Sequence, residues 1–146
     1  MMIDPRGPRF AAAVTTVVLA AVLITGSAWL LALQAAVFAL AVLRGPSRSP
    51  YGLLYIRLIR PRLKPPAELE DPRPPRFAQA VGLGFSIVGL LGYLSGGTVI
   101  AYVAVGAALA AAFLNAAFGF CLGCEVYLMY RRIVSARSNR SPEVTP

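Results

Sequence analysis

The chain contains few charged residues and no histidine, and both shortages limit what it can be. Only 14% of its 146 residues are charged, whereas 58% are hydrophobic, a balance outside the range of water-soluble proteins. A water-soluble core with a polar surface is therefore the wrong picture. A closed zinc site needs four ligands, and a chain with two cysteines and no histidine can complete one only as a dimer.

Two long stretches, residues 10–43 and 77–124, contain no charge at all. At about 1.5 Å per residue, the shorter stretch would be roughly 51 Å long as one helix, whereas the hydrocarbon core of a bilayer is about 30 Å thick. Each stretch therefore holds two spans, and Gly26 and the Gly96-Gly97 pair mark the breaks. The sequence predicts an all-α polytopic membrane protein, one membrane domain over residues 1–146, with transmembrane helices at Phe10 to Thr25, Ala28 to Leu43, Phe77 to Leu94 and Thr98 to Phe118.

The two hairpin turns lack lysine and arginine, and this absence sets the predicted orientation. All basic residues lie before the first span, between the second and third, or after the fourth. Under the positive-inside rule, both termini and the central loop are cytoplasmic. A cleaved signal peptide is the alternative for the first span, but its apolar run continues into a second helix, which favours a signal anchor.

Thirteen arginines against one lysine, with abundant alanine, glycine and proline, are typical of a GC-rich bacterial genome, so the predicted location is the bacterial inner membrane.

The net charge of +8 indicates attraction to anionic lipid headgroups. No basic surface interleaved with aromatic residues supports nucleic-acid binding. The spans themselves lack charged side chains, which argues against a proton relay or an ion pathway.

A short motif occurs twice, and it divides the chain into two related halves. Residues 4–14 (Asp-Pro-Arg-Gly-Pro-Arg-Phe-Ala-Ala-Ala-Val) recur 67 positions later as residues 71–81, with nine of eleven identical. At the same offset, residues 51–54 lie opposite residues 118–121. A two-helix unit returns to the side on which it began, so the halves are predicted to be parallel tandem repeats. The predicted organisation is repeat 1 over residues 4–63, a proline-rich linker over 64–70, repeat 2 over 71–134 and a disordered cytoplasmic tail over 135–146.

Each motif has a local structural explanation, because aspartate is a good N-cap and proline suits a first helical turn. The motif arginines Arg6, Arg9, Arg73 and Arg76 are predicted at headgroup depth, paired with lipid phosphate. The alternative is an anion site where the two motifs converge. Residues 51–63 alternate apolar side chains with arginines and predict a short interfacial helix.

Small residues spaced four apart in the fourth span predict a compact four-helix bundle, with a face left over for a homodimer. Gln34 and Asn115 are the costly polar residues inside the spans. We expect them to face the bundle and to hydrogen-bond to each other or to backbone, or alternatively to line a polar path for a small solute.

Cys121 and Cys124 are the only cysteines, and Glu125 follows them directly. They are predicted at the cytoplasmic end of the fourth helix, where a pair is usually reduced, so a structural disulfide is not expected. A helix C-terminus and Glu125, as a modulator, should raise the thiol pKa values. The alternatives are thiol redox exchange, metal binding by a dimer, or plain packing.

The repeated motif, the Ser49-Pro50-Tyr51-Gly52 segment and residues 115–125 (Asn-Ala-Ala-Phe-Gly-Phe-Cys-Leu-Gly-Cys-Glu) together resemble a bacterial membrane family common in actinobacteria, domain of unknown function 4395. The resemblance covers roughly residues 3–132. It implies a link to thiol or sulfur handling with a thioredoxin-like or rhodanese-like cytoplasmic partner, and it brings no defined enzymatic activity and no cofactor. The function expected first is a thiol redox or sulfur-handling role of the cysteine pair, more plausibly with a partner than as a stand-alone enzyme. The alternatives are a non-catalytic scaffold or accessory subunit, and a dimeric transporter of a small sulfur compound.

Overall fold

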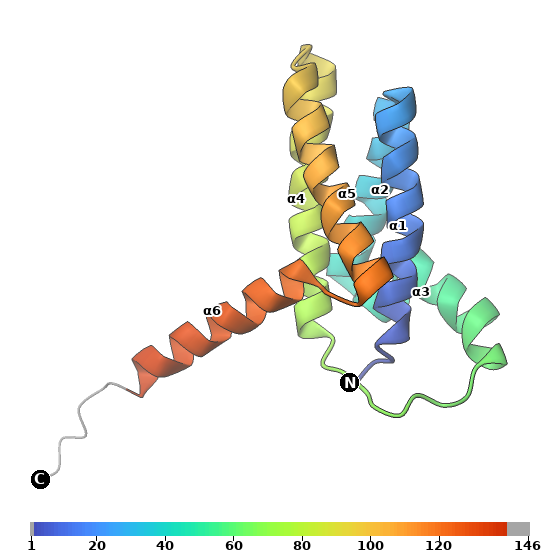
Figure 1. The fold of residues 1–146 in the computed structure, drawn as a ribbon, viewed down its shortest axis with the longest axis vertical. Helices are drawn as coiled ribbons and strands as arrows, with labels where there is room; N and C mark the ends of the chain where they lie inside the picture. The colour runs from blue at the N-terminus through green and yellow to red at the C-terminus, as the bar shows by residue number, and fades with distance from the viewer. Residues whose placement is uncertain (1, 140–146) are drawn as a thin grey trace, which may run out of the picture.

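Four long helices form an upright bundle in the computed structural model, which describes residues 2–139 (Figure 1). They are α1 (Arg6–Thr25), α2 (Ala28–Arg44), α4 (Arg73–Ser95) and α5 (Thr98–Phe118). Helices α1, α4 and α5 are long and apolar enough to cross a membrane, and α2 is a shorter apolar helix of 17 residues. Within residues 2–139 the regular structure is helical, apart from one isolated bridge between Ile3 and Glu70. The predicted all-α class is confirmed.

The helices begin earlier than the hydrophobic pattern predicts. Helix α1 starts at Arg6 rather than Phe10, and α4 starts at Arg73 rather than Phe77. The prolines of each motif fit inside the first turn, because backbone N–H groups there have no helical partner to lose. The motif is therefore the first turn of a long helix and not a separate segment before it.

Glycines in the left-handed region make both hairpin turns. Gly26 has a φ of 64° and donates its N–H to Val22 O, and Gly96 has a φ of 83°. A residue with a side chain rarely adopts this conformation, so glycine ends each helix at low cost. Ser27 then caps α2 by accepting the N–H of Leu30 at 3.2 Å. The predicted helix breaks lie where the structure has them.

The bundle is held mainly by contacts between the two halves of the chain. Helix α1 packs along α5 and α2 packs along α4. Of the two hairpins, α4 and α5 also pack closely, whereas α1 and α2 touch less. The main cluster of buried apolar side chains lies between α1, α2 and α5. It consists of Leu19, Val22, Leu31, Val105 and Ala108. Small residues permit the close approach: the backbone of Gly92 lies so near Ala101 that an added Cβ would be 2.8 Å from Ala101 N.

The base of the bundle carries the connecting segments. The chain is helical from Pro50 to Arg62 through α3 (Pro50–Leu54), η2 (Tyr55–Ile59) and η3 (Arg60–Arg62), preceded by the short η1 (Pro46–Arg48). This agrees with the short helix expected at residues 51–63. The linker that follows returns to the N-terminus, where Ile3 and Glu70 exchange two backbone hydrogen bonds of 2.8 Å.

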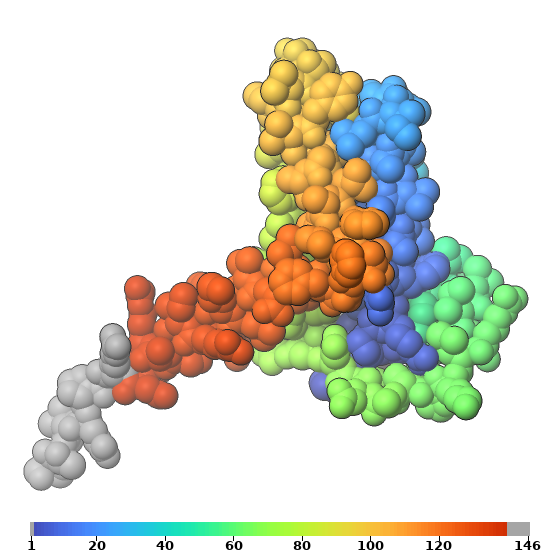
Figure 2. Space-filling view, viewed as in Figure 1, coloured from blue at the N-terminus to red at the C-terminus, as the bar shows by residue number. Residues whose placement is uncertain are grey.

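A further helix, α6 (Leu122–Ser138), leaves the base and projects from the bundle, as Figures 1 and 2 show. The sequence reading is wrong here in two respects. Helix α5 ends at Phe118 as predicted, but Gly119 then turns the chain with a φ of 67°, so the cysteines lie at the start of a new helix and not at the end of the fourth. Residues 135–138, predicted as disordered tail, are the last turn of α6. Asn139 follows as the C-cap residue of α6, and residues 140–146 of the predicted tail lie outside the described residues.

Candidate functional site: a disulfide beneath the bundle

Cys121 and Cys124 form a disulfide at the start of α6, with their Cα atoms 5.1 Å apart. Cys121 is the N-cap residue, and its Sγ accepts the backbone N–H of Cys124 at 3.1 Å. The expectation of a reduced pair at a helix C-terminus is therefore wrong. The cysteines were expected beside the negative, C-terminal end of a helix dipole. Because a new helix begins at Cys121, they lie beside the positive, N-terminal end of the α6 dipole, which favours a thiolate.

The cap at Cys121 has a counterpart in the first half of the chain. Ser49 is the N-cap of α3, and its Oγ accepts the N–H of Gly52 at 3.1 Å. In position and hydrogen bonding, Ser49 and Gly52 match Cys121 and Cys124. The fixed offset of 67 residues had placed residues 54–57 opposite the cysteines, and the structure corrects this alignment. The loop between the second helix and the cap differs in length between the halves, so the offset changes along the chain.

A cleft of about 540 Å³ opens beside the disulfide. Its walls come from the first turns of α1 and α4, the end of α5 and the start of α6. The polar side chains in the wall include Arg9, Gln79, Asn115 and Glu125, and both cysteines line it. Each cysteine is half-buried, so the disulfide is accessible from the cleft. Gln79 is a lining residue that the sequence reading did not single out as a site. Its position inside the second motif, at one of the two places where the two copies differ, was the available signal.

Arg9 in α1 and Arg76 in α4 occupy equivalent places in the two halves, and each caps the second long helix of the other half. Arg9 donates from Nε to Ala116 O at 3.1 Å and from Nη2 to Ala117 O at 3.2 Å, at the end of α5. Arg76 donates in the same way to Val42 O and Leu43 O near the end of α2. The last carbonyls of a helix have no partner within it and carry its negative dipole end, so a guanidinium satisfies both needs. These two guanidinium forks are therefore engaged within the protein.

Arg6 and Arg73 are also engaged locally, each with the aspartate of its own motif. Arg6 Nη2 lies 3.0 Å from Asp4 Oδ2, and Arg73 Nη2 lies 2.7 Å from Asp71 Oδ2. The structure does not bring the four motif arginines together. Arg6 and Arg9 line the cleft, whereas Arg73 lines a neighbouring groove with Arg131 and Arg132.

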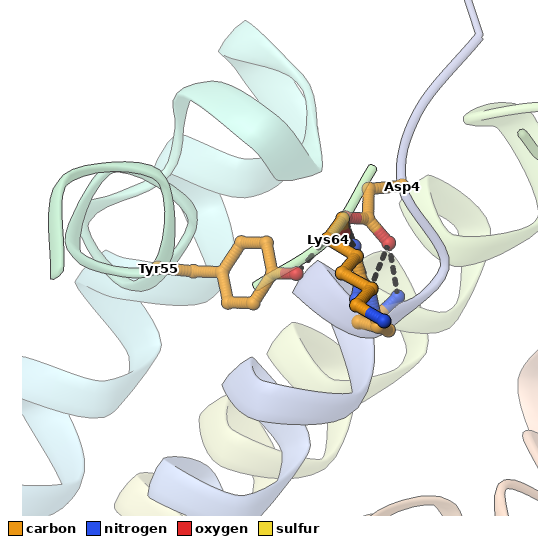
Figure 3. Close-up of polar contacts among 4 residues, drawn as sticks. Asp4, Tyr55 and Lys64 are labelled. Atoms are coloured by element: carbon orange, nitrogen blue, oxygen red, sulfur yellow. Dashed lines mark hydrogen bonds and ion pairs between the residues drawn. The ribbon is translucent and has the colours of Figure 1, made fainter. Parts of the chain in front are cut away.

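Asp4, the aspartate of the first motif, connects the start of α1 to the helical segment that follows α3 (Figure 3). Asp4 accepts hydrogen bonds from the Arg6 side chain, from the Arg6 N–H at 3.0 Å and from the Tyr55 hydroxyl at 2.9 Å. Arg6 also donates to Lys64 O at 2.9 Å. Burial alone would raise the pKa of Asp4, but the bonds from Arg6 and Tyr55 outweigh it, so this pKa lies below its usual 3.8. Burial and the bond to Asp4 raise the pKa of Tyr55.

The second aspartate is in a more exposed setting. The hydrogen bond from the Arg73 side chain lowers the pKa of Asp71, and no tyrosine takes part. In neither motif is the aspartate the N-cap residue, which is Pro5 in α1 and Pro72 in α4. Each aspartate instead lies one residue before the N-cap proline, and its carboxylate accepts the N–H of the first helical residue, which is Arg6 or Arg73.

Gln34 and Asn115 are not hydrogen-bonded to each other, contrary to one sequence expectation. The fully buried Gln34 donates to Thr15 Oγ1 at 3.4 Å and accepts the Tyr51 hydroxyl at 2.6 Å. These bonds join α1, α2 and α3. Asn115 is half-buried and lies in the wall of the cleft near the disulfide. The two amides differ because the Tyr51 hydroxyl reaches Gln34 from α3, a contact that the sequence did not predict.

The molecule is thus an all-helical protein in which apolar helices carry a disulfide-lined cleft at one end. Within residues 2–139, no group of three or more histidine, cysteine, aspartate or glutamate side chains is placed to hold a metal ion. The chain belongs to the family described as Domain of unknown function (DUF4395), whose profile matches residues 3–132. Neither a curated protein nor a solved structure matches the chain.

Proposed function

We propose that the chain crosses the bacterial inner membrane four times, with the disulfide and both termini on the cytoplasmic side. The support is the exclusion of every lysine and arginine from the two hairpin turns, together with three helices of spanning length. Helix α2 is about 26 Å long at 1.5 Å per residue, slightly short of the hydrocarbon core. Arg44 at its end can reach the headgroups with its long side chain, which makes up the difference.

The two halves are proposed to be parallel tandem repeats. The repeated motif, the reciprocal caps by Arg9 and Arg76 and the matching caps at Ser49 and Cys121 support this relation. Only the second half has cysteines at the cap. The same local geometry therefore serves a structural turn in one half and offers redox chemistry in the other.

The disulfide is proposed to exchange electrons with a dithiol on a cytoplasmic protein of the thioredoxin-like or rhodanese-like kind. A partner thiolate attacks Cys121 Sγ, the Cys121–Cys124 bond breaks, and the electron pair leaves on Cys124, which takes up a proton. The second partner thiol loses its proton and attacks the partner's own sulfur, releasing the Cys121 thiolate. The partner ends as a disulfide and this chain as a dithiol, and the reverse sequence reduces a partner disulfide.

The mixed disulfide is assigned to Cys121 because of its position at the helix N-terminus. The Cys124 N–H and the α6 dipole stabilise a thiolate on Cys121, which makes it the better attacking group in the reduced protein and the better leaving group at the final step. Glu125 lines the same cleft and is exposed, so its carboxylate can accept the proton of the second thiol. The cleft beside a half-buried disulfide is the single observation that carries this function.

The test is to trap the partner in native membranes. Cys124→Ser leaves Cys121 without its resolving thiol, so it should accumulate a mixed disulfide that reducing agent releases. Cys121→Ser is the matched control and should accumulate several-fold less. Both variants should keep the wild-type membrane level. If neither variant traps a partner and both native thiols label identically under oxidant and reductant, the proposed thiol function is wrong.

A further inference from the structure

One face of α6 is apolar and has no partner within the described chain. Val126, Met129, Tyr130 and Ile133 are 53–63% exposed. Their spacing of three, one and three residues places them on one side of the helix. A helix that exposes such a stripe to water loses the free energy of burying it, so the stripe requires a covering surface.

The other side of α6 is fixed to the bundle. Gly123 lies so close to α4 that an added Cβ would be 2.6 Å from Ala78 Cβ. One turn later, the Tyr127 ring packs 5.7 Å from the Phe77 ring. Cys124 and Leu128 line the cleft. Since these contacts hold the first two turns, the apolar stripe must point away from both α4 and the cleft.

The position and charge of α6 favour lipid as the covering surface. The helix starts directly after α5 ends, and Phe118 at that junction is 72% exposed, continuous with the exposed apolar side chains of α5. In α6, three arginines accompany a single glutamate, Glu125. An apolar stripe beside basic residues is the pattern of a helix that lies in the membrane interface and attracts anionic headgroups.

We propose that α6 lies in the cytoplasmic interface of the membrane, with the stripe of Val126, Met129, Tyr130 and Ile133 in the lipid. Cys124, which is on the opposite side of the helix, then faces the aqueous phase. The interfacial helix thereby holds the disulfide at headgroup depth, open toward a soluble protein. This inference rests on the proposed membrane topology and adds a lipid contact that sets the depth and orientation of the thiol site.

The depth of each side of α6 tests this arrangement directly. The full chain carries Cys121→Ser and Cys124→Ser, and a single spin label is placed through Met129→Cys or Ile133→Cys. Ser135→Cys and Leu128→Cys are the controls on the opposite side. In vesicles of phosphatidylcholine and phosphatidylglycerol, the ratio of collisions with oxygen to collisions with a water-soluble nickel chelate should be several-fold higher at 129 and 133 than at 135 and 128.

A ratio that is equal on both sides, or higher at 135, overturns the inference. A second measurement keeps the native cysteines: Met129→Glu should displace the helix from the lipid and change the rate at which a water-soluble reductant opens the disulfide, whereas Ser135→Glu should not. Equal rates for the two variants count against the lipid contact. The label variants contain neither native cysteine, so a normal depth profile without partner trapping refutes only the thiol function. A flat profile with normal trapping refutes only the lipid contact.

Discussion

Replacing Arg9 by glutamine removes the guanidinium that closes the end of α5. Two hydrogen bonds to Ala116 O and Ala117 O are lost, and glutamine is too short and uncharged to replace them. Arg76→Gln is the matched variant, because it removes the same pair of contacts from α2. Arg9 lines the cleft of the disulfide and Arg76 does not. The two variants therefore separate the effect on stability from the effect on the site.

The expected magnitude follows from the number and setting of the contacts. A hydrogen bond contributes about 1 kcal/mol net, and one to a charged group about 1.5–3 kcal/mol. Both arginines are exposed, so solvent screening reduces the upper value. Each variant should lose about 1–2 kcal/mol of unfolding free energy, which is a factor of roughly 5–30 in the folded-to-unfolded ratio.

The assay is reversible unfolding in mixed micelles, combined with the rate of disulfide reduction by a water-soluble thiol. Both variants should lose similar stability, but only Arg9→Gln should change the reduction rate, by several-fold, because the frayed end of α5 leads through Gly119 into Cys121. Arg9→Lys keeps the charge without the fork and should be intermediate in stability. If Arg9→Gln and wild type have equal stability and equal reduction rates, the Arg9 cap on α5 contributes nothing and the reasoning is refuted.

Two further variants test the base of the bundle. Gly123→Ala should push the first turn of α6 off Ala78 and speed reduction of the disulfide several-fold, whereas Gly84→Ala, which meets nothing within 4 Å, should leave that rate unchanged. Asp4 has a lowered pKa in the folded protein, so its stabilising effect is complete above the unfolded pKa of about 3.8 and disappears as the pH falls through the lower folded value. Asp4→Asn should therefore be less stable than wild type at neutral pH and show a flatter decline below about pH 4, measured by unfolding in mixed micelles across that range. A wild-type profile for Asp4→Asn would contradict this linkage.

The helices of the bundle follow from local properties that the sequence displays openly. The positions of α1, α2, α4 and α5 can be predicted to within a few residues. The signals are the long charge-free stretches, the glycines at the two turns and the prolines that suit a first helical turn. The repeated motif also predicted that the two halves would be alike at their starts. All of these are signals between residues that are near one another in the chain, and hydrophobicity and turn chemistry act over that range.

The candidate site depended on contacts that no local pattern displays. The predicted fourth span already ended at Phe118, but only the structure shows that Gly119 turns the chain there and that Cys121 begins a new helix. That change replaces the negative end of one helix dipole with the positive end of another at the same sulfur atoms. Likewise, Arg9 contacts α5 and Arg76 contacts α2 only because α1 packs on α5 and α4 packs on α2. The sequence determined the four long helices of the bundle and the presence of a cysteine pair, whereas the structure decided the electrostatic surroundings of that pair, because those surroundings come from the start of α6 and from residues far apart in the chain.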